Sequence, residues 1–176
     1  MNRIYILGTS GAGKSTLANA LSASRAMTHL ELDSIYHQPN WTPLPTEEFR
    51  AKVQSYCERE TWVIDGNYSV VRDVILARAD AIILLDYSRF TIMVRVIRRT
   101  LRRMLTRQEL WNGNREEWKY LFTPNREKNI VLWAWSTFAE RRASFEQLVA
   151  TASVPVLRFT KPSQTNTWLR KNLSRS

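Results

Sequence analysis

Gly8-Thr9-Ser10-Gly11-Ala12-Gly13-Lys14-Ser15-Thr16 is the most informative stretch of this sequence, because its first eight residues fit the pattern G-x-x-x-x-G-K-[ST]. An apolar, strand-like run (residues 4–7) precedes it, and an amphipathic helical pattern follows it. Glycines allow the backbone dihedrals that turn several N–H groups toward one anion, and the start of a helix adds its positive end. The stretch therefore predicts a polyphosphate-binding loop between a strand and a helix.

The residue types within the loop predict how the phosphates are held. Lys14 can reach the β- and γ-phosphates, and the hydroxyl of Ser15 is placed to ligate Mg²⁺. The alternative, a chance glycine turn, does not account for the agreement between the motif and its flanking pattern. The backbone around the phosphates is expected to come from Gly8, Thr9, Ser10, Gly11, Ala12 and Gly13.

Length and composition are those of an ordinary globular chain. The 176 residues suit a single domain over residues 1–176, with 44% apolar and 24% charged residues. The single cysteine, Cys57, excludes an internal disulfide, and no signal-peptide pattern or membrane-spanning apolar run is visible. We therefore expect a cytoplasmic protein with no membrane partner.

The net charge of +10 predicts a polyanionic partner, such as a nucleotide or a nucleic acid. The charge is concentrated between Arg89 and Lys128, where eleven Lys or Arg residues face four Glu residues. We expect the anion to bind in this part of the chain.

Apolar runs alternate with helical patterns along the whole chain, which predicts the fold class. The run Ala81-Ile82-Ile83-Leu84-Leu85 is typical of a strand buried on both faces of a parallel sheet. The alternation predicts a five-stranded parallel α/β domain with right-handed crossovers. The other strands are expected at residues 4–7, 28–32, 61–64 and 154–159.

Three aspartates follow predicted strands, at the edge where parallel sheets bind ligands. Asp65 is the preferred partner for Mg²⁺ opposite Ser15, with a plain Asp-Gly turn as the alternative. Asp86 is a second candidate for that role. Asp33 could bind a substrate hydroxyl, an amine or a metal-bound water, or could form an Asx turn.

From Ser88 onward the pattern is helical and has two faces. One face is apolar, and the other carries arginines at a spacing that is destabilising unless an anion lies between them. Arginine suits the binding of phosphoryl oxygens, and a nucleic-acid backbone is the alternative anion. The apolar face is expected to hold Phe90, Met93, Val94, Ile97, Leu101, Met104 and Leu105, and the basic face Arg95, Arg98, Arg99, Arg102 and Arg103.

Residues 107–125 form a turn-rich insert, within a lid of about residues 105–127, that we expect to be a mobile cover excluding water from the phosphates. Arg115 and Arg126 are expected to point inward from it. The aromatic residues from Trp111 onward are interpreted as packing residues; in a nucleic-acid interpretation they would be stacking platforms.

These pieces resemble the adenylate kinase-like branch of phosphate-loop NTPases. Within it, Leu32-Asp33, Asp65-Gly66-Asn67-Tyr68 and Gly113-Asn114-Arg115-Glu116 are similar to the family of DNA topology modulation proteins. The resemblance covers nearly the whole chain.

The resemblance implies a nucleotide site with assigned residues. ATP phosphates would be held by Gly11, Gly13, Lys14, Ser15 and Thr16, and Asp65 would lie near Mg²⁺. Arg95 would lie against the ATP base, and Arg99 would contact phosphate. One departure concerns the acceptor: adenylate kinases place an arginine soon after Asp-Gly, whereas the first arginine here is Arg72. AMP is therefore not expected as the acceptor.

Three functions follow as hypotheses. The preferred one is a kinase-like phosphotransferase that moves the γ-phosphate of ATP·Mg²⁺ to a small-molecule or nucleotide acceptor of unknown identity, with Lys14, Asp33, Arg95, Arg99 and Arg115 in catalytic roles. The second is a nucleic-acid-associated ATPase that affects DNA topology. The third is a nucleotide-dependent regulatory protein with little turnover.

Overall fold

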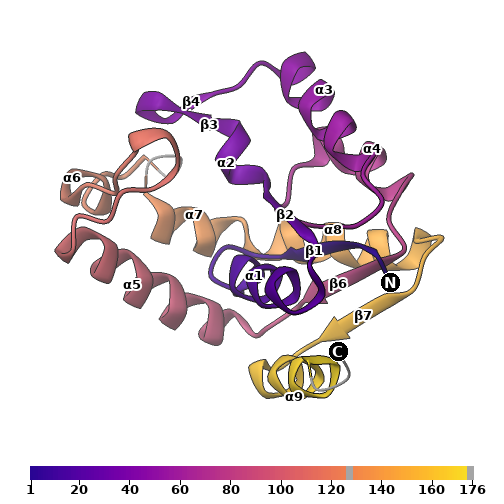
Figure 1. The fold of residues 1–176 in the computed structure, drawn as a ribbon. Coiled ribbons are helices and arrows are strands. Elements are labelled where there is room, and N and C mark those ends of the chain that lie inside the picture. The colour runs from indigo at the N-terminus through magenta and orange to yellow at the C-terminus, as the bar shows by residue number, and fades with distance from the viewer. Residues whose placement is uncertain (126–128, 174–176) are drawn as a thin grey trace.

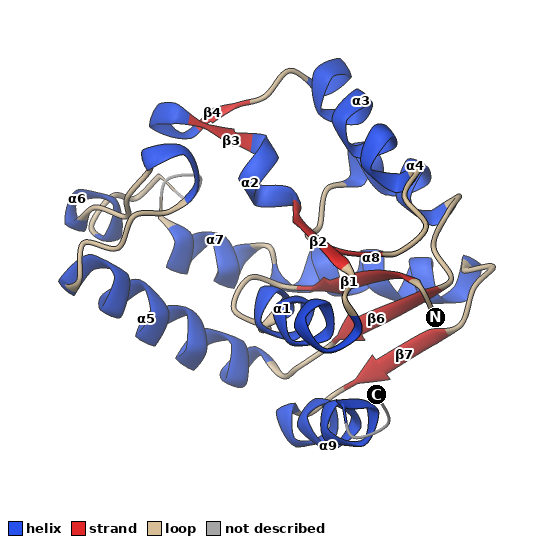
Figure 2. Ribbon diagram, in the orientation of Figure 1, coloured by secondary structure: helices blue, strands red, loops and turns tan. Residues whose placement is uncertain are grey.

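The structure is a computed structural model that describes residues 1–125 and 129–173. Its centre is a parallel five-stranded sheet with strand order β2-β5-β1-β6-β7 (Figures 1 and 2). The strand ends that carry the phosphate loop and the predicted aspartates therefore lie at one edge of the sheet. The strands are β1 (Arg3–Gly8), β2 (Thr28–Glu31), β5 (Trp62–Asp65), β6 (Ala81–Leu85) and β7 (Val156–Phe159), and a separate short hairpin pairs β3 (His37–Gln38) with β4 (Thr42–Pro43).

Helices connect the strands and cover both faces of the sheet (Figure 1). The apolar residues of β1 alternate between the two faces, with Ile4 and Ile6 in one core cluster and Tyr5 and Leu7 in the other. The first cluster packs against α1 (Lys14–Arg25), α5 (Arg89–Leu105), α7 (Ile130–Ser136) and α9 (Pro162–Leu173), and the second against α3 (Thr46–Cys57), α4 (Arg72–Leu76) and α8 (Phe138–Thr151). The remaining helices are the short α2 (Leu32–Tyr36) and α6 (Trp118–Leu121) and the 3-10 turns Pro39–Trp41, Ser69–Val71 and Trp111–Gly113.

The predicted parallel five-stranded sheet is confirmed, and the differences are local. Asp33 lies within α2 instead of in a turn after the strand, because the chain turns into a helix directly after Glu31. Within the described residues, no helix combines the length and hydropathy that crossing a bilayer requires.

The apolar face predicted for α5 is not the face that packs against the rest of the protein. The helix buries Ile92, Val96, Thr100 and Met104 against the protein. Most of the predicted residues are exposed, with Phe90 at 80% and Leu105 at 74%. Helical periodicity alone does not tell which of two apolar stripes packs against the core. The arginine face excludes one side of the helix and leaves both stripes as candidates.

Cys57 is expected to be unreactive in the folded protein. It is 2% exposed, and burial raises the pKa of its thiol to about 11, so little thiolate forms at neutral pH. With DTNB at pH 8, the native protein should release less than about one-tenth of an equivalent of thionitrobenzoate per chain. The protein unfolded in guanidinium should release about one full equivalent. Rapid stoichiometric labelling of the native protein would contradict this burial.

Candidate active site

The phosphate loop curls between β1 and α1, as its glycines predict. Gly11 and Gly13 have φ angles of +81° and +96°, and α1 begins at the next residue, Lys14. A Cβ at Gly11 would lie 2.6 Å from Cγ2 of Val96, so the loop packs directly against α5. This left-handed, glycine-dependent backbone at a helix N-terminus fits the cradle that a polyphosphate requires.

Lys14 lies at this cradle, and no carboxylate of residues 1–125 or 129–173 forms an ion pair with its ammonium group. Its Nζ donates a hydrogen bond to the backbone oxygen of Thr9 at 3.3 Å. Burial lowers the pKa of the ammonium group, while the carboxylates of Asp33 and Asp65 act in the opposite direction. Because a buried cation is stabilised by a nearby opposite charge, the geometry favours an anion in the loop.

Two carboxylates lie beside Ser15, and the sequence pointed to only one of them. Glu31 and Asp65 are register partners at the ends of β2 and β5. The Ser15 hydroxyl donates to Oε1 of Glu31 at 2.7 Å and lies 3.4 Å from Oδ1 of Asp65. A serine hydroxyl facing carboxylate oxygens is a donor set that Mg²⁺ accepts. Glu31 was missed, although its place two residues before Asp33, at the end of a strand, was an available signal.

Asp65 is held in place from its other side. Its Oδ2 contacts Nε2 of His29 at 3.2 Å, and Nδ1 of His29 contacts Oδ1 of Asn19 at 2.9 Å. Among residues 1–125 and 129–173, no group of three or more His, Cys, Asp or Glu side chains forms a cage for a metal.

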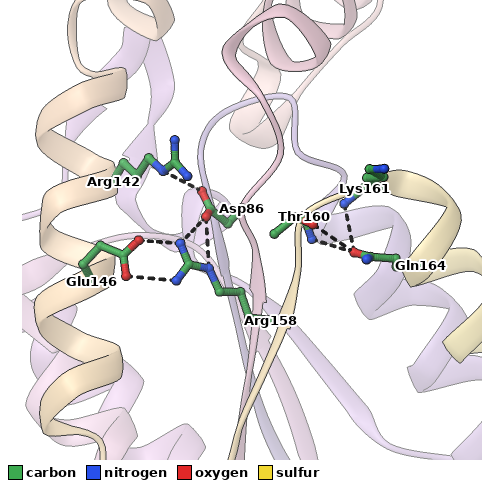
Figure 3. Close-up of polar contacts among 7 residues, drawn as sticks. All are labelled: Asp86, Arg142, Glu146, Arg158, Thr160, Lys161 and Gln164. Carbon is green, nitrogen blue, oxygen red and sulfur yellow. Dashed lines mark hydrogen bonds and ion pairs between the residues drawn. The ribbon is translucent and has the colours of Figure 1, made fainter.

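Asp86, the second candidate for the metal, belongs to an ion-pair network (Figure 3). Its Oδ2 accepts from Nε of Arg158 at 3.0 Å, and Nε of Arg142 lies 3.5 Å from its Oδ1. Arg158 also donates to Glu146 at 2.9 Å, so the network joins β6, β7 and α8. Nearby, Oε1 of Gln164 accepts hydrogen bonds from the backbone N–H groups of Thr160 and Lys161, the two residues that precede α9. The surroundings of Asp86 are therefore those of a structural residue.

Replacing Asp86 with asparagine is expected to lower the free energy of unfolding by about 2 kcal/mol, because it removes the buried negative charge that pairs with both Arg158 and Arg142 and leaves only Glu146 beside Arg158. Nucleotide binding should be unchanged. Urea unfolding and calorimetric titration with ATP measure the two effects separately. Normal stability with lost Mg²⁺ dependence would instead place Asp86 at the metal.

Two of the predicted arginines reach the phosphate loop from α5. Arg95 donates to the backbone oxygen of Ala12 at 3.0 Å, and Arg99 donates to the Ser10 hydroxyl at 3.1 Å. Burial, followed by the charge of Arg103, lowers the pKa of Arg99. A cavity of about 470 Å³ beside Arg99 is lined by Arg98, Arg99, Arg102, Arg103 and Gln108. Of these arginines, Arg95 and Arg99 are positioned to bind an anion at the loop.

Arg115 does not point inward, contrary to the sequence-based expectation. Its side chain is 54% exposed and is paired with Glu109 at 3.3 Å, next to a short antiparallel bridge between these two residues. The cation that turns inward near it is Arg103, paired with Glu116 at 2.8 Å, where both side chains are largely buried. Arg126 lies outside the described residues.

Asp33 lies in a polar cluster beside the loop. The Tyr68 hydroxyl donates to Oδ1 of Asp33 at 2.5 Å and lies 3.4 Å from Nε2 of His37. Burial and the adjacent Asp33 raise the pKa of Tyr68, so its hydroxyl keeps its proton. Burial lowers the pKa of His37, which makes this imidazole neutral at pH 7. The sequence pointed to Asp33 but not to its pairing with Tyr68, because Tyr68 lies 35 residues further along the chain.

The cover (residues 107–125) is docked onto the segment that follows Asp33. Asn112 donates to the backbone oxygen of His37 at 2.6 Å and to that of Ser34 at 3.1 Å. Asn114 is 4% exposed; it donates to the backbone oxygen of Gln38 and accepts from the N–H of Trp41, both at 2.9 Å. The described conformation of the cover is therefore closed over the side of the site that holds Asp33.

Aromatic rings line the space between the cover and α2. The Trp111 ring stacks on His37 with a centroid distance of 5.8 Å, and Trp41 meets Trp111 edge-on at 6.5 Å. Nε1 of Trp111 donates to Oε2 of Glu31 at 2.8 Å, so the cover touches the carboxylate beside Ser15. The sequence predicted the packing role of Trp111 but not its hydrogen bond to Glu31.

Two further arginines lie near this cluster, and sequence reasoning assigned a role in the site to neither of them. Arg141 of α8 carries its charge close enough to affect Lys14, Tyr68 and Asp33, and burial lowers its pKa. Arg72, the first arginine after Asp65, donates to Asn67 at 3.1 Å and to Ser144 at 3.2 Å. Arg141 has no signal in the sequence, because only the packing of α8 against the sheet brings it here.

Comparison with solved structures assigns the fold. A gluconokinase from Sinorhizobium meliloti matches with a TM-score of 0.56 at 17% identity over 99% of this chain and 92% of that chain. A shikimate kinase from Acinetobacter baumannii, in complex with shikimate, matches with a TM-score of 0.57 at 15% identity over 100% and 95%. One from Bacteroides thetaiotaomicron matches with a TM-score of 0.58 at 16% identity over 98% and 97%.

The chain has the fold of phosphate-loop kinases. No protein-family model and no curated protein matches its sequence. The resemblance to DNA topology modulation proteins therefore stays a prediction from the quoted motifs. The likeness in fold extends over nearly the full length of each neighbouring structure, including the sheet and the helices around the loop.

Proposed function

We propose that this protein is a phosphotransferase that moves the γ-phosphoryl group of ATP to a hydroxyl group of a small-molecule acceptor. The observation that carries the proposal is the contact of the Ser15 hydroxyl with Glu31 and Asp65, with Asp33 only two residues beyond Glu31. A phosphate cradle, a place for a metal and a further carboxylate, that of Asp33, thus meet at one edge of the sheet. Phosphoryl transfer between two substrates needs these three elements together.

The nucleotide would occupy the loop from Gly8 to Thr16, with Lys14 at its phosphates. Ser15, Glu31 and Asp65 would hold Mg²⁺, directly or through water; when bound, the ion neutralises charge on the β- and γ-phosphates. Arg95 and Arg99 already contact the loop, at Ala12 and Ser10 respectively, and would bind phosphate oxygens. No rearrangement of α5 is needed for this, because both guanidinium groups already lie at the loop.

Asp33 is the proposed group for the acceptor. Tyr68 holds Oδ1 of Asp33 through a hydrogen bond of 2.5 Å, which fixes the carboxylate while a hydroxyl binds to it. The carboxylate would orient that hydroxyl and take its proton as transfer proceeds. The neutral His37 and the rings of Trp41 and Trp111 would wall the acceptor from water.

A small hydroxylated acceptor agrees with the neighbouring structures and with the surroundings of Arg72. One neighbour of similar length is a shikimate kinase in complex with shikimate. Arg72 is engaged with Asn67 and Ser144, so it does not replace the nucleotide-binding arginine of adenylate kinases. The nucleic-acid hypothesis gains nothing from Arg95 and Arg99, because these side chains turn toward the loop instead of outward.

The test is ADP formation from ATP·Mg²⁺ in the presence of single candidate acceptors: sugars, sugar acids, cyclic polyols, nucleosides and nucleotides. We expect one chemical class of hydroxyl compound to raise ADP formation at least about tenfold and to become phosphorylated, as seen by ³¹P NMR. Arg99→Ala should then lower kcat strongly. Stimulation by duplex DNA alone, with no phosphorylated product, would overturn the proposal in favour of a nucleic-acid-associated ATPase.

A further inference from the structure

Glu31 connects the cover to the phosphate loop through its two carboxylate oxygens. Oε2 accepts from the Trp111 indole at 2.8 Å, and Oε1 accepts from the Ser15 hydroxyl at 2.7 Å. Asp65 lies 3.4 Å from the same hydroxyl, and the indole directly contacts Glu31, one of the three proposed metal ligands. The carboxylate of Glu31 therefore has one oxygen fixed by the cover and one oxygen aimed at the metal side.

Trp111 is itself fixed by the docking of the cover. The next residue, Asn112, bonds to the backbone oxygens of Ser34 and His37, and the Trp111 ring stacks on His37. When this tip of the cover detaches, the indole N–H must leave Glu31. The orientation of Glu31 thus depends on whether the cover is closed.

We propose that Trp111 is a positioning residue which, through Glu31, links closure of the cover to the affinity for Mg²⁺·nucleotide. The inference rests on the proposed function and adds a regulation of the same site. With the cover closed, the indole holds the carboxylate in the rotamer that faces Ser15; with the cover open, the carboxylate turns freely and binds the metal less well. Because such coupling is reciprocal, bound Mg²⁺·nucleotide also stabilises the closed cover.

The first experiment replaces the indole with a ring that lacks the N–H group. Trp111→Phe keeps an aromatic contact with His37 but removes the donor to Glu31. Calorimetry should show ATP binding about tenfold weaker with Mg²⁺ and unchanged in EDTA, since the lost bond involves a charged group. Trp118→Phe is the matched control, because Trp118 lies in the same cover and is 45% exposed. It should bind ATP like the wild type in both buffers.

The second experiment tests whether Trp111 acts through Glu31. Glu31→Gln should also weaken binding in the presence of Mg²⁺, and adding Trp111→Phe to it should cause less than a twofold further loss. If Trp111 had a purely structural role, the losses of ATP affinity in the two single variants would multiply in the double variant. Trp111→Phe would then also lose as much ATP affinity in EDTA as in Mg²⁺. Either result, or full Mg²⁺-dependent affinity in Trp111→Phe, would overturn the proposal. Glu31→Gln leaves the aromatic contacts in place, so it remains informative if Trp111→Phe folds poorly.

A third measurement reads the cover directly, without turnover. In the wild type, Mg²⁺·ADP should slow hydrogen exchange of the amides in residues 109–116 about tenfold more than ADP in EDTA does; in Trp111→Phe this difference should vanish. Lys14→Ala separates the two proposals. If Lys14→Ala binds ATP normally, the proposed function fails. If Lys14→Ala loses ATP binding but Mg²⁺·ADP still slows amide exchange in residues 109–116 of Trp111→Phe as in the wild type, only the coupling fails.

Discussion

Lys14→Ala is expected to lower the rate of phosphoryl transfer about 1,000-fold, because a preorganised cation at the transferred phosphate is lost from a site that excludes water. Lys14 is partly buried in the loop, where its Nζ donates a long hydrogen bond to the backbone oxygen of Thr9. Little of the fold depends on it. The thermal midpoint should therefore stay within a few degrees of the wild type.

The measurements are ADP release at saturating ATP and calorimetric ATP affinity. Lys52→Ala is the matched control, because Lys52 is half exposed and pairs with Glu48 on the surface of α3. It should leave both quantities unchanged. Turnover of Lys14→Ala within about threefold of the wild type would show that nucleotide chemistry does not occur at this loop.

Asp33→Asn is expected to lower kcat about 100- to 1,000-fold, the range for loss of a general base, with little change in the KM for ATP. Asparagine has nearly the same shape and keeps an oxygen to accept from Tyr68, so the cluster with His37 should survive. The measurement is steady-state kinetics with the acceptor that the hydroxyl panel identifies.

Tyr68→Phe is the companion variant for Asp33. It removes the hydroxyl that fixes the carboxylate but leaves the carboxylate itself, so we expect a kcat loss of about tenfold. Asp33→Asn with near-normal kcat and a raised KM for the acceptor would restrict Asp33 to binding. Equal losses in both variants would assign the effect to the Asp33–Tyr68 pair as a unit.

The loop and the sheet could be predicted because their signals are local. The glycine spacing, the lysine and the flanking apolar run lie within one short stretch, and each buried strand shows its own apolar pattern. The choice between Asp65 and Asp86 is not local. β5 and β6 lie on opposite sides of β1, and only β5 also borders β2, whose Glu31 shares the Ser15 hydroxyl.

The partners in the site that sequence reasoning missed are long-range ones. Glu31 meets Trp111 from a distant part of the chain, and Asp33 meets Tyr68 across the sheet edge. No periodicity or motif encodes such pairs, because they form only when the cover and the strands are assembled. Arg115 shows the opposite error. Its charge suggested a role at the phosphates, but Glu109 on the other arm of the same turn pairs with it at the surface.

The way the cover is anchored has a consequence for how this fold can diversify. Asn112 and Asn114 bind backbone atoms of Ser34, His37, Gln38 and Trp41, not their side chains. Every amino acid offers a backbone oxygen, and every one except proline offers the N–H group used at position 41. The side chains of this segment can therefore change over evolutionary time while the cover keeps its hydrogen bonds to the backbone. The same cover could then serve proteins that act on different acceptors.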